Sequence, residues 1–383
     1  MGLLLAGVAA TPAHAASIRS QQWHLDSMKA DEMWKSSTGK GVTVAVIDTG
    51  VGHLPELEGQ VLRGKNLAPG VKGDERQDYD GHGTTISAVI AGTGKHPSGD
   101  GAFGLAPGVK ILPIRVPSER DPKTPNWVEA IRYAADSDAK IINISLAAVS
   151  NGKENDALRA EAVKYAHSKG KIIFAGVGNS AQSYNEILFP AATPGVVGVA
   201  AIDRQGNATA ESQKGAQVDL AAPGMDIVTA CTKQSGVCKS HGTSDATALA
   251  SASAALIWSA HPDWTNNQVL RVLLNTAGKP RDGVQRNDHI GYGVVRPRIA
   301  LTNPGDPGPA NEWPLPDLAA PASAPPNSPA PAPAGSAPAQ QPSQAAADSG
   351  DDGSSLPWIA LGLGAAVLIG GAVTVVAVRA RNR

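Results

Sequence analysis

The sequence Val-Thr-Val-Ala-Val-Ile-Asp-Thr-Gly at residues 42–50 decides the fold class. Its first six residues are apolar or β-branched, which is typical of a strand that is buried on both faces. Further apolar runs of this kind follow at residues 110–116, 140–144, 171–176 and 196–200. Amphipathic stretches alternate with these runs, at residues 84–91, 126–137, 154–168, 244–260 and 266–276. The alternation predicts an α/β domain whose mostly parallel sheet is covered by helices on both faces.

The composition divides the chain into a domain and a linker. Residues 16–302 have the composition of a globular protein, and about 285 residues are enough for one large core. Residues 303–355 are rich in Pro, Ala, Ser and Gln and carry few large apolar side chains, so we expect a linker there. The net charge of -1, from 33 basic and 34 acidic residues, provides no broad positive surface. A nucleic-acid partner is therefore not expected.

Apolar segments near the two ends predict export and membrane insertion. Residues 1–15 contain an apolar run and end in Ala-His-Ala, the small-x-small pattern of a signal peptidase site. No basic stretch precedes this run, which leaves open a true start upstream of Met1. Residues 356–378 are uncharged and would span about 33 Å as a helix, enough to cross a bilayer. Three arginines in residues 379–383 predict a short cytoplasmic tail, and hence a single-pass cell-membrane protein with its domain outside the cytoplasm.

The chain has two cysteines, Cys231 and Cys238, separated by six residues. In an oxidising exterior this spacing predicts a disulfide that closes a hairpin. Two free thiols are the alternative, and a metal site with only two ligands is a poorer explanation. The nine histidines include no His-Glu-x-x-His sequence. We therefore predict neither a metal nor a cofactor, and calcium sites stay open because no ligand loop is legible.

Four glycine-marked turns each carry one polar side chain that is suited to acyl transfer. Asp48 ends the first strand run, and His82 stands in Gly-His-Gly-Thr where a helical run begins. Asn179 follows a buried strand in Gly-Asn-Ser, and Ser244 opens a helix of small residues. Taken alone, each side chain is explained by a turn or a helix cap. Together, at strand ends and helix starts, they predict a catalytic site.

These four blocks resemble those of the subtilases, and the resemblance extends over residues 23–302. The order Asp, His, Ser along the chain is also that of subtilisin. The resemblance implies a serine endopeptidase in which Asp48, His82 and Ser244 form the catalytic triad. It also implies that Asn179 and the Ser244 N–H hold the oxyanion.

The implied substrate-binding segment and three other positions depart from the family pattern. Ser145-Leu146-Ala147 stands where subtilases carry Ser-Leu-Gly, a strand that pairs with the peptide substrate. Asp245 replaces a usual apolar residue, Ala248 a usual proline and Thr85 a frequent second histidine. None of these changes removes a catalytic group. We expect Asp245 in the first turn of the nucleophile's helix, where its carboxylate would favour the helix dipole but oppose the oxyanion.

The closer resemblance is to the mycosins, which are membrane-anchored subtilases associated with type VII secretion. The signal peptide, protease domain, Pro-rich stalk and C-terminal helix match in layout, as does the segment Gln22-Trp23-His24-Leu25. The resemblance implies polypeptide substrates and a type VII secretion membrane complex as partner. The alternative is a protease-fold scaffold that stabilises such a complex without needing hydrolysis. An esterase is disfavoured, because Ser244 stands in Gly-Thr-Ser-Asp-Ala and not in Gly-x-Ser-x-Gly.

Overall fold

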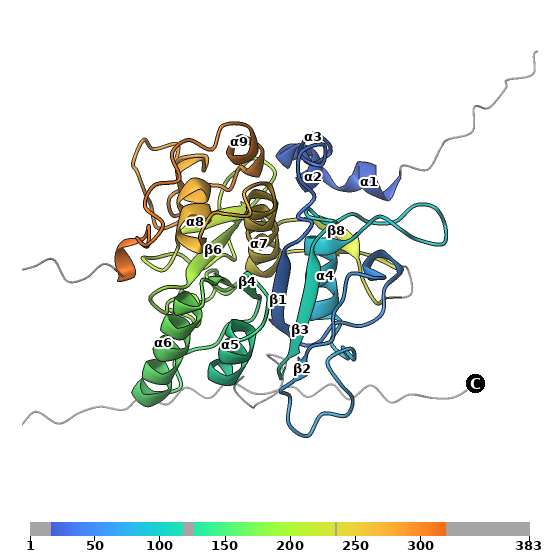
Figure 1. Ribbon diagram of the computed structural model, residues 1–383, viewed down its shortest axis with the longest axis horizontal. Coiled ribbons are helices and arrows are strands. Elements are labelled where there is room, and N and C mark those ends of the chain that lie inside the picture. The colour runs from blue at the N-terminus through green and yellow to red at the C-terminus, as the bar shows by residue number, and fades with distance from the viewer. Residues whose placement is uncertain (1–16, 118–125, 234–235, 319–383) are drawn as a thin grey trace, which may run out of the picture. The chain divides into compact units, whose positions relative to one another are not determined.

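The structure is a computed structural model that describes residues 17–117, 126–233 and 236–318 (Figure 1). Its helices, strands and short 3-10 turns are, in chain order, α1 Ile18–Gln21, α2 Trp23–Met28, α3 Ala30–Met33, β1 Thr43–Asp48, η1 Pro55–Leu57, β2 Lys65–Asn66, α4 His82–Ala91, β3 Lys110–Arg115, α5 Trp127–Ala135, β4 Ile141–Ile144, α6 Lys153–Ser168, β5 Ile172–Gly176, β6 Val197–Ile202, β7 Leu220–Pro223, β8 Ile227–Ala230, β9 Val237–Ser240, α7 Thr243–Ala260, α8 Asn266–Asn275, α9 Pro297–Thr302 and η2 Pro316–Leu318.

Seven strands form one sheet in the order β2-β3-β1-β4-β5-β6-β7. All six neighbouring pairs run parallel. Because alternate side chains of a strand face opposite ways, Val44 and Val46 join a core with α4 and α7, and Ala45 and Ile47 join one with α5 and α6. The predicted α/β class, with a mostly parallel sheet between layers of helices, is confirmed.

Each predicted strand and helix matches an element of the structure to within three residues at either end, whereas α1, α2, α3, α9, β2 and β7 had no predicted counterpart. β7 was not predicted, because Leu-Ala-Ala-Pro is a short run that ends in a proline. The strands β8 and β9 form an antiparallel hairpin beyond the sheet. A disulfide joins Cys231 and Cys238 at this hairpin, as predicted from their spacing.

Residues 303–318, which the composition assigned to the linker, pack on the domain. Nη1 of Arg271 donates to the backbone oxygens of Pro307 and Pro309 at 2.8 and 2.9 Å. Leu315 is buried, and the Trp313 ring lies edge-on to His167 with 4.3 Å between centroids. The composition could not predict this packing, because Arg271 binds backbone carbonyl groups, and every residue type has one. The domain therefore continues past Thr302 to at least Leu318.

The predictions for the two ends of the chain lie outside the described residues. This applies to the signal peptide at 1–15, the linker beyond residue 318, the membrane helix at 356–378 and the tail at 379–383. Within the described ranges, no helix is long and apolar enough to span a bilayer.

Candidate active site

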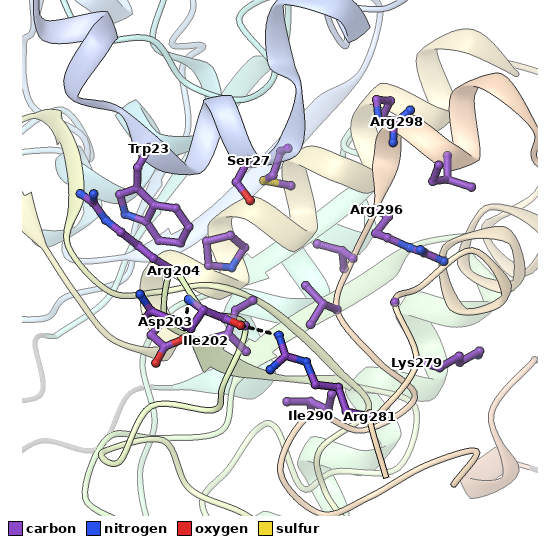
Figure 2. Close-up of a pocket in the computed structure, with 18 residues that line it drawn as sticks. Trp23, Ser27, Ile202, Asp203, Arg204, Lys279, Arg281, Ile290, Arg296 and Arg298 are labelled. Carbon is purple, nitrogen blue, oxygen red and sulfur yellow. Dashed lines mark hydrogen bonds between the residues drawn. The ribbon is translucent and has the colours of Figure 1, made fainter. Parts of the chain in front are cut away.

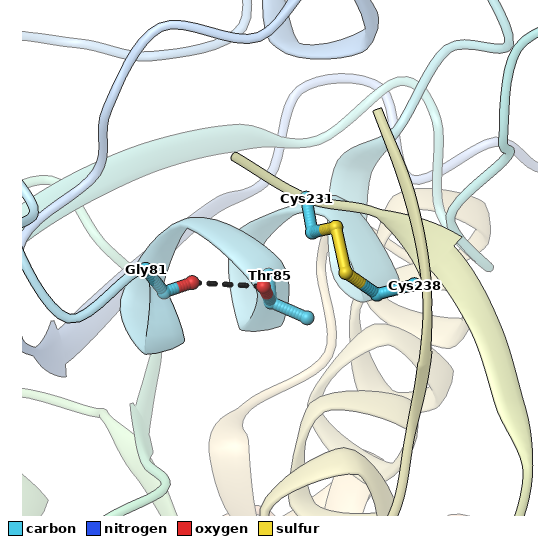
Figure 3. Close-up of a disulfide and its surroundings, with 4 residues drawn as sticks. All are labelled: Gly81, Thr85, Cys231 and Cys238. Carbon is cyan, nitrogen blue, oxygen red and sulfur yellow. Dashed lines mark hydrogen bonds between the residues drawn. A yellow bond between two sulfur atoms is a disulfide. The ribbon is translucent and has the colours of Figure 1, made fainter. Parts of the chain in front are cut away.

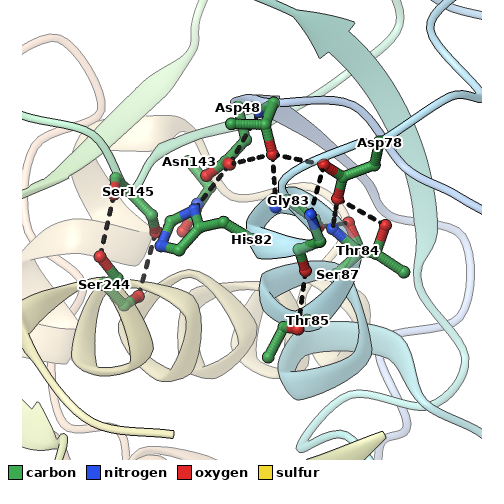
Figure 4. A network of polar contacts seen from close by, with 12 residues as sticks. Asp48, Asp78, His82, Gly83, Thr84, Thr85, Ser87, Asn143, Ser145 and Ser244 are labelled. Atoms are coloured by element: carbon green, nitrogen blue, oxygen red, sulfur yellow. Dashed lines mark hydrogen bonds and ion pairs between the residues drawn. The ribbon is translucent and has the colours of Figure 1, made fainter. Parts of the chain in front are cut away.

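Asp48 and His82 meet at the carboxyl end of β1. Asp48 is the last residue of that strand, and His82 is the first residue of α4. Nδ1 of His82 lies 2.7 Å from Oδ1 of Asp48, which also accepts a hydrogen bond from the Thr49 N–H (Figure 4). The Asp48 side chain is 1% exposed and the His82 side chain 31%. A buried carboxylate thus fixes an accessible imidazole and favours a proton on Nδ1, which leaves Nε2 as a base.

A second carboxylate, Asp78, ties the loop after β1 to the first turn of α4. Its Oδ1 accepts from Thr49 Oγ1 and from the Gly81 N–H, both at 2.8 Å. Its Oδ2 accepts from the N–H and the hydroxyl of Thr84 at 2.8 and 2.6 Å. Asp78 was not predicted from the sequence as a site residue. An acidic residue just ahead of a predicted helix start is a usual capping signal, and it was the clue available.

The glycine after His82 is required by close packing. A Cβ atom at Gly83 would lie 2.3 Å from the Gly50 carbonyl oxygen and 3.0 Å from Cβ of Asp48. Any larger residue would therefore push α4 away from β1 and separate His82 from Asp48. This explains why a glycine must follow the histidine in Gly-His-Gly.

Ser244 and Asn179 meet at the start of α7. The Thr243 N–H donates to Oδ1 of Asn179 at 2.8 Å, which leaves the side-chain NH₂ of Asn179 as a donor. The preceding Gly242 has φ 118°, and a Cβ there would lie 2.9 Å from Nδ2 of Asn179. The structure thus brings the predicted amide donor beside the helix that carries the predicted nucleophile.

The predicted substrate-binding segment Ser145-Leu146-Ala147 follows β4 and lies against Ser244. The Ser244 hydroxyl donates to the Ser145 carbonyl at 2.9 Å, and the Ser145 hydroxyl donates to the Ser244 carbonyl at 3.0 Å. Asn143, another residue that the sequence analysis missed, donates to the Ser145 hydroxyl at 3.0 Å. Asn143 also accepts from Ser251 at 2.9 Å and so links β4 to α7 inside the core. Leu146 is buried, and no regular strand pairs with this segment in the described sheet.

Asp245 lies in the first turn of α7, as predicted, but it is fully buried. Its Oδ2 accepts from the Ser240 hydroxyl at 2.8 Å. Its Oδ1 has no hydrogen-bond partner within the described part of the chain. Burial raises the pKa of Asp245 to about 6, against the Ser240 hydrogen bond and the nearby His82 and His241, which lower it. The carboxyl group next to the predicted nucleophile therefore has a pKa of about 6.

The disulfide hairpin lies beside the first turns of α4 (Figure 3). A Cβ at Gly81 would lie 2.8 Å from Oγ1 of Thr232, the residue that follows Cys231. Thr85 donates through its hydroxyl to the Gly81 carbonyl at 2.8 Å, and so closes the same turn from within the helix. The hairpin thus supports the turn that carries His82. In the described ranges, no group of three or more His, Cys, Asp or Glu side chains is placed to hold a metal ion.

Comparisons with known proteins show the family to which the chain belongs. A family model described as "Subtilase family" matches residues 39–293. Mycosin-1 of Mycolicibacterium smegmatis is 31% identical over 363 residues, which cover 81% of this chain and 76% of that protein. The crystal structure of MycP1 from Mycobacterium smegmatis matches with a TM-score of 0.66 and 30% identity, over 78% of this chain and 89% of that one. A chain in the structure of the periplasmic assembly from the ESX-5 inner membrane complex matches with a TM-score of 0.66 and 27% identity, over 83% of this chain and 91% of that one.

Proposed function

The chain belongs to the subtilase family of serine endopeptidases and is most similar to the mycosins, and from that premise we propose that Asp48, His82 and Ser244 are its catalytic triad. The observation that carries the proposal is the 2.7 Å contact between buried Asp48 and accessible His82, together with the place of Ser244 in the first turn of α7. Asn179 and the Ser244 N–H complete the site as donors to the oxyanion.

The reaction is acyl transfer in two stages. Oγ of Ser244 bonds to the scissile carbonyl carbon while its proton, which now points to the Ser145 carbonyl, passes to Nε2 of His82. The negative charge that forms on the carbonyl oxygen is held by Asn179 and the Ser244 N–H. His82 then gives the proton to the leaving amine as the C–N bond breaks. A water molecule hydrolyses the acyl-enzyme by the same steps, and Asp48 stabilises the imidazolium throughout.

The substrate is an extended polypeptide that adds as a strand alongside Ser145-Leu146-Ala147. An added strand is held by backbone hydrogen bonds and is selected by pockets for alternate side chains. Ala147 carries a methyl group where subtilases have glycine, so the substrate backbone has less space beside this segment. Cleavage should therefore favour small side chains near the scissile bond.

We further propose that the protease acts outside the cytoplasm at a membrane. The support is the sequence pattern, which predicts a signal peptide at 1–15, a linker beyond the domain, a membrane helix at 356–378 and a basic tail at 379–383. The partner is a type VII secretion membrane complex. The support for this partner is the likeness to MycP1 and to a chain of the ESX-5 inner membrane complex.

The second candidate function is a scaffold in which hydrolysis is dispensable. The observation that favours it is also the likeness to a chain of the ESX-5 inner membrane complex, because a component of an assembly can stabilise it without turnover. Both functions use the same fold, so only the effect of removing the nucleophile separates them.

The decisive test of the triad is labelling of the purified full chain by a fluorescent fluorophosphonate. The label should bond to Ser244 and be absent from Ser244→Ala. Ser259→Ala, at the other end of the same helix, is the matched control and should label like the unchanged protein. Labelling of Ser244→Ala at the normal rate would exclude Ser244 as the nucleophile.

The scaffold function is tested in cells that lack the protein. Ser244→Ala is expressed at the normal level, and both secretion and recovery of the assembled membrane complex are measured. If hydrolysis is required, secretion of the processed substrate is lost. If secretion and assembly are both unchanged, the scaffold function is the correct one.

A further inference from the structure

A cavity of about 400 Å³ lies away from the candidate active site, and its walls are strongly basic (Figure 2). None of the site residues Asp48, His82, Asn179 and Ser244 lines it. We call this cavity the basic pocket. Its five cationic side chains are Arg204, Lys279, Arg281, Arg296 and Arg298.

The positive charge of the basic pocket is not neutralised by the domain itself. Among residues 17–117, 126–233 and 236–318, no carboxylate forms an ion pair with any of the five cations. Asp203 is the one acidic residue among those that line the pocket, and its Oδ1 accepts from the N–H groups of Gln205 and Asn207, both at 2.9 Å. This carboxylate therefore stabilises the turn that begins at Asp203. The local excess of positive charge contrasts with the net charge of -1 of the whole chain.

Hydrogen bonds to backbone carbonyls hold several of these cations in place. Arg296 donates from Nε to the Thr276 carbonyl at 2.9 Å and from Nη2 to the Ala277 carbonyl at 3.1 Å. Arg281 donates from Nη2 to the Gln205 carbonyl at 2.5 Å. A side chain held in this way loses less entropy when it binds a ligand. Burial lowers the pKa of Lys279, and the neighbouring charge of Arg296 lowers it further.

The remaining lining of the basic pocket is largely apolar. It includes the indole of Trp23 and the side chains of Ile202, Pro223, Val294 and Ile299. The Arg204 guanidinium lies over the Trp23 ring, 5.4 Å from its centroid. A ligand that fits this lining needs an apolar part as well as negative charge.

The cations surround the basic pocket and do not converge on one point. In Figure 2, Arg204 lies at the left of the cavity, Arg281 at the bottom, and Lys279, Arg296 and Arg298 at the right. A single phosphate would reach only part of this ring, whereas carboxylates spaced along a peptide would reach both sides. We propose that the basic pocket binds an acidic peptide segment of a partner protein, with one apolar side chain of that segment inserted between the cations.

The experiment measures binding of two fluorescent peptides to the full chain in detergent, by anisotropy. The acidic probe is Gly-Glu-Asp-Leu-Glu-Asp-Gly, and the neutral probe replaces each acid by its amide. The acidic probe should bind at least about tenfold more tightly than the neutral one, and a rise in salt from 50 to 300 mM should weaken it by a similar factor. Equal binding of the two probes would overturn the proposal.

Variants and a competitor locate the binding. The double variant Arg281→Gln, Arg298→Gln should bind the acidic probe at least about tenfold more weakly. Arg63→Gln, an exposed arginine outside the pocket, is the matched control and should bind normally. The unchanged chain, the double variant and Arg63→Gln should all hydrolyse a test peptide at the same rate. Unchanged binding in the double variant would overturn the proposal, as would full competition by millimolar inorganic phosphate. The salt dependence of binding to the unchanged chain tests the proposal without any variant.

Discussion

Two buried carboxyl groups, Asp48 and Asp245, lie in the candidate active site. They differ in the hydrogen-bond donors that contact their oxygens. Oδ1 of Asp48 lies 2.8 Å from the Thr49 N–H nitrogen and 2.7 Å from Nδ1 of His82. Asp245 receives one donor, the Ser240 hydroxyl at 2.8 Å. Each leaves one oxygen without a partner among the described residues. Asp48 contacts the ring of a histidine, whereas burial raises the pKa of Asp245 to about 6.

This difference shows that burial alone does not assign a role to an acid. In the proposed mechanism, the charge of Asp48 stabilises the imidazolium of His82 and so contributes to catalysis. Asp245 lies in the first turn of the nucleophile's helix, where the helix dipole favours its charge but full burial opposes it. We therefore expect the same substitution, Asp to Asn, to have opposite consequences at the two positions.

The largest expected effect is that of Asp48→Asn. The amide cannot stabilise the imidazolium and favours the wrong tautomer of His82, and the corresponding substitution in other serine proteases lowers kcat by about 10⁴. We expect a loss of that order in peptide hydrolysis, with the fold retained by circular dichroism. Asp245→Asn is the matched comparison and should be at least as active as the unchanged chain at pH 8. Similar losses in both variants would remove the distinction between the two acids.

Asn179→Ala should have the next largest effect. It removes the proposed side-chain donor to the oxyanion, and loss of such a donor in subtilisin lowers kcat by about 10² to 10³. Fluorophosphonate labelling of Ser244 should persist, because the nucleophile and its base stay in place. The effect on kcat is measured with a peptide substrate at saturating concentration. An unchanged kcat would mean that another group holds the oxyanion, and the charge of Asp245 would then have to be judged against that group.

The third prediction concerns stability and pH. The pKa of Asp245 is about 6 in the fold, above its ordinary value of 3.8. As pH rises, Asp245 therefore loses its proton at a lower pH in the unfolded chain than in the fold. Its contribution to the free energy of unfolding falls between about pH 4 and pH 6, and this lower stability persists above pH 6. Asp245→Asn should thus be more stable than the unchanged chain at pH 8, by at most about 3 kcal/mol, and equally stable at pH 4. Urea unfolding at both pH values measures this, and a gain that is equal at pH 4 and pH 8 would show that the charge is not the cause.

The sequence predicted the α/β class and the positions that come together at the sheet edge. Asp48, His82, Asn179 and Ser244 could be identified because each stands in a glycine-marked turn at the end of a buried run or the start of a helix. Such turns are local, and their residues are dictated by backbone geometry and close approach, as at Gly83. Local geometry of this kind can be recognised in one sequence.

Contacts between distant segments could not be predicted in this way. Asp78 binds Thr49, 29 residues earlier, and Arg271 binds Pro307, 36 residues later. The burial of Asp245 depends on how β9 and α4 pack around the start of α7, so its pKa could not be inferred from its place in the helix alone. The basic pocket likewise combines side chains from α2, the loop after β6 and the segment around α9. Apart from the capping signal at Asp78, no local pattern marks these sites.

The smallest expected effect is that of Asp245→Asn on turnover. At pH 8 the carboxylate opposes the oxyanion, and at 6 to 8 Å and an effective dielectric of 20 the repulsion is about 2 to 3 kcal/mol before screening. The same charge favours the imidazolium of His82, which is among the groups that interact with Asp245. Because the two charges form together in the transition state, most of the repulsion is offset, and kcat of Asp245→Asn should rise by less than about tenfold. At pH 5 Asp245 is largely protonated, so the ratio of kcat between the variant and the unchanged chain should return toward one. A variant that is slower at pH 8 and equally slow at pH 5 would show that Asp245 positions the start of α7 through its hydrogen bond to Ser240 and that its charge is not the cause.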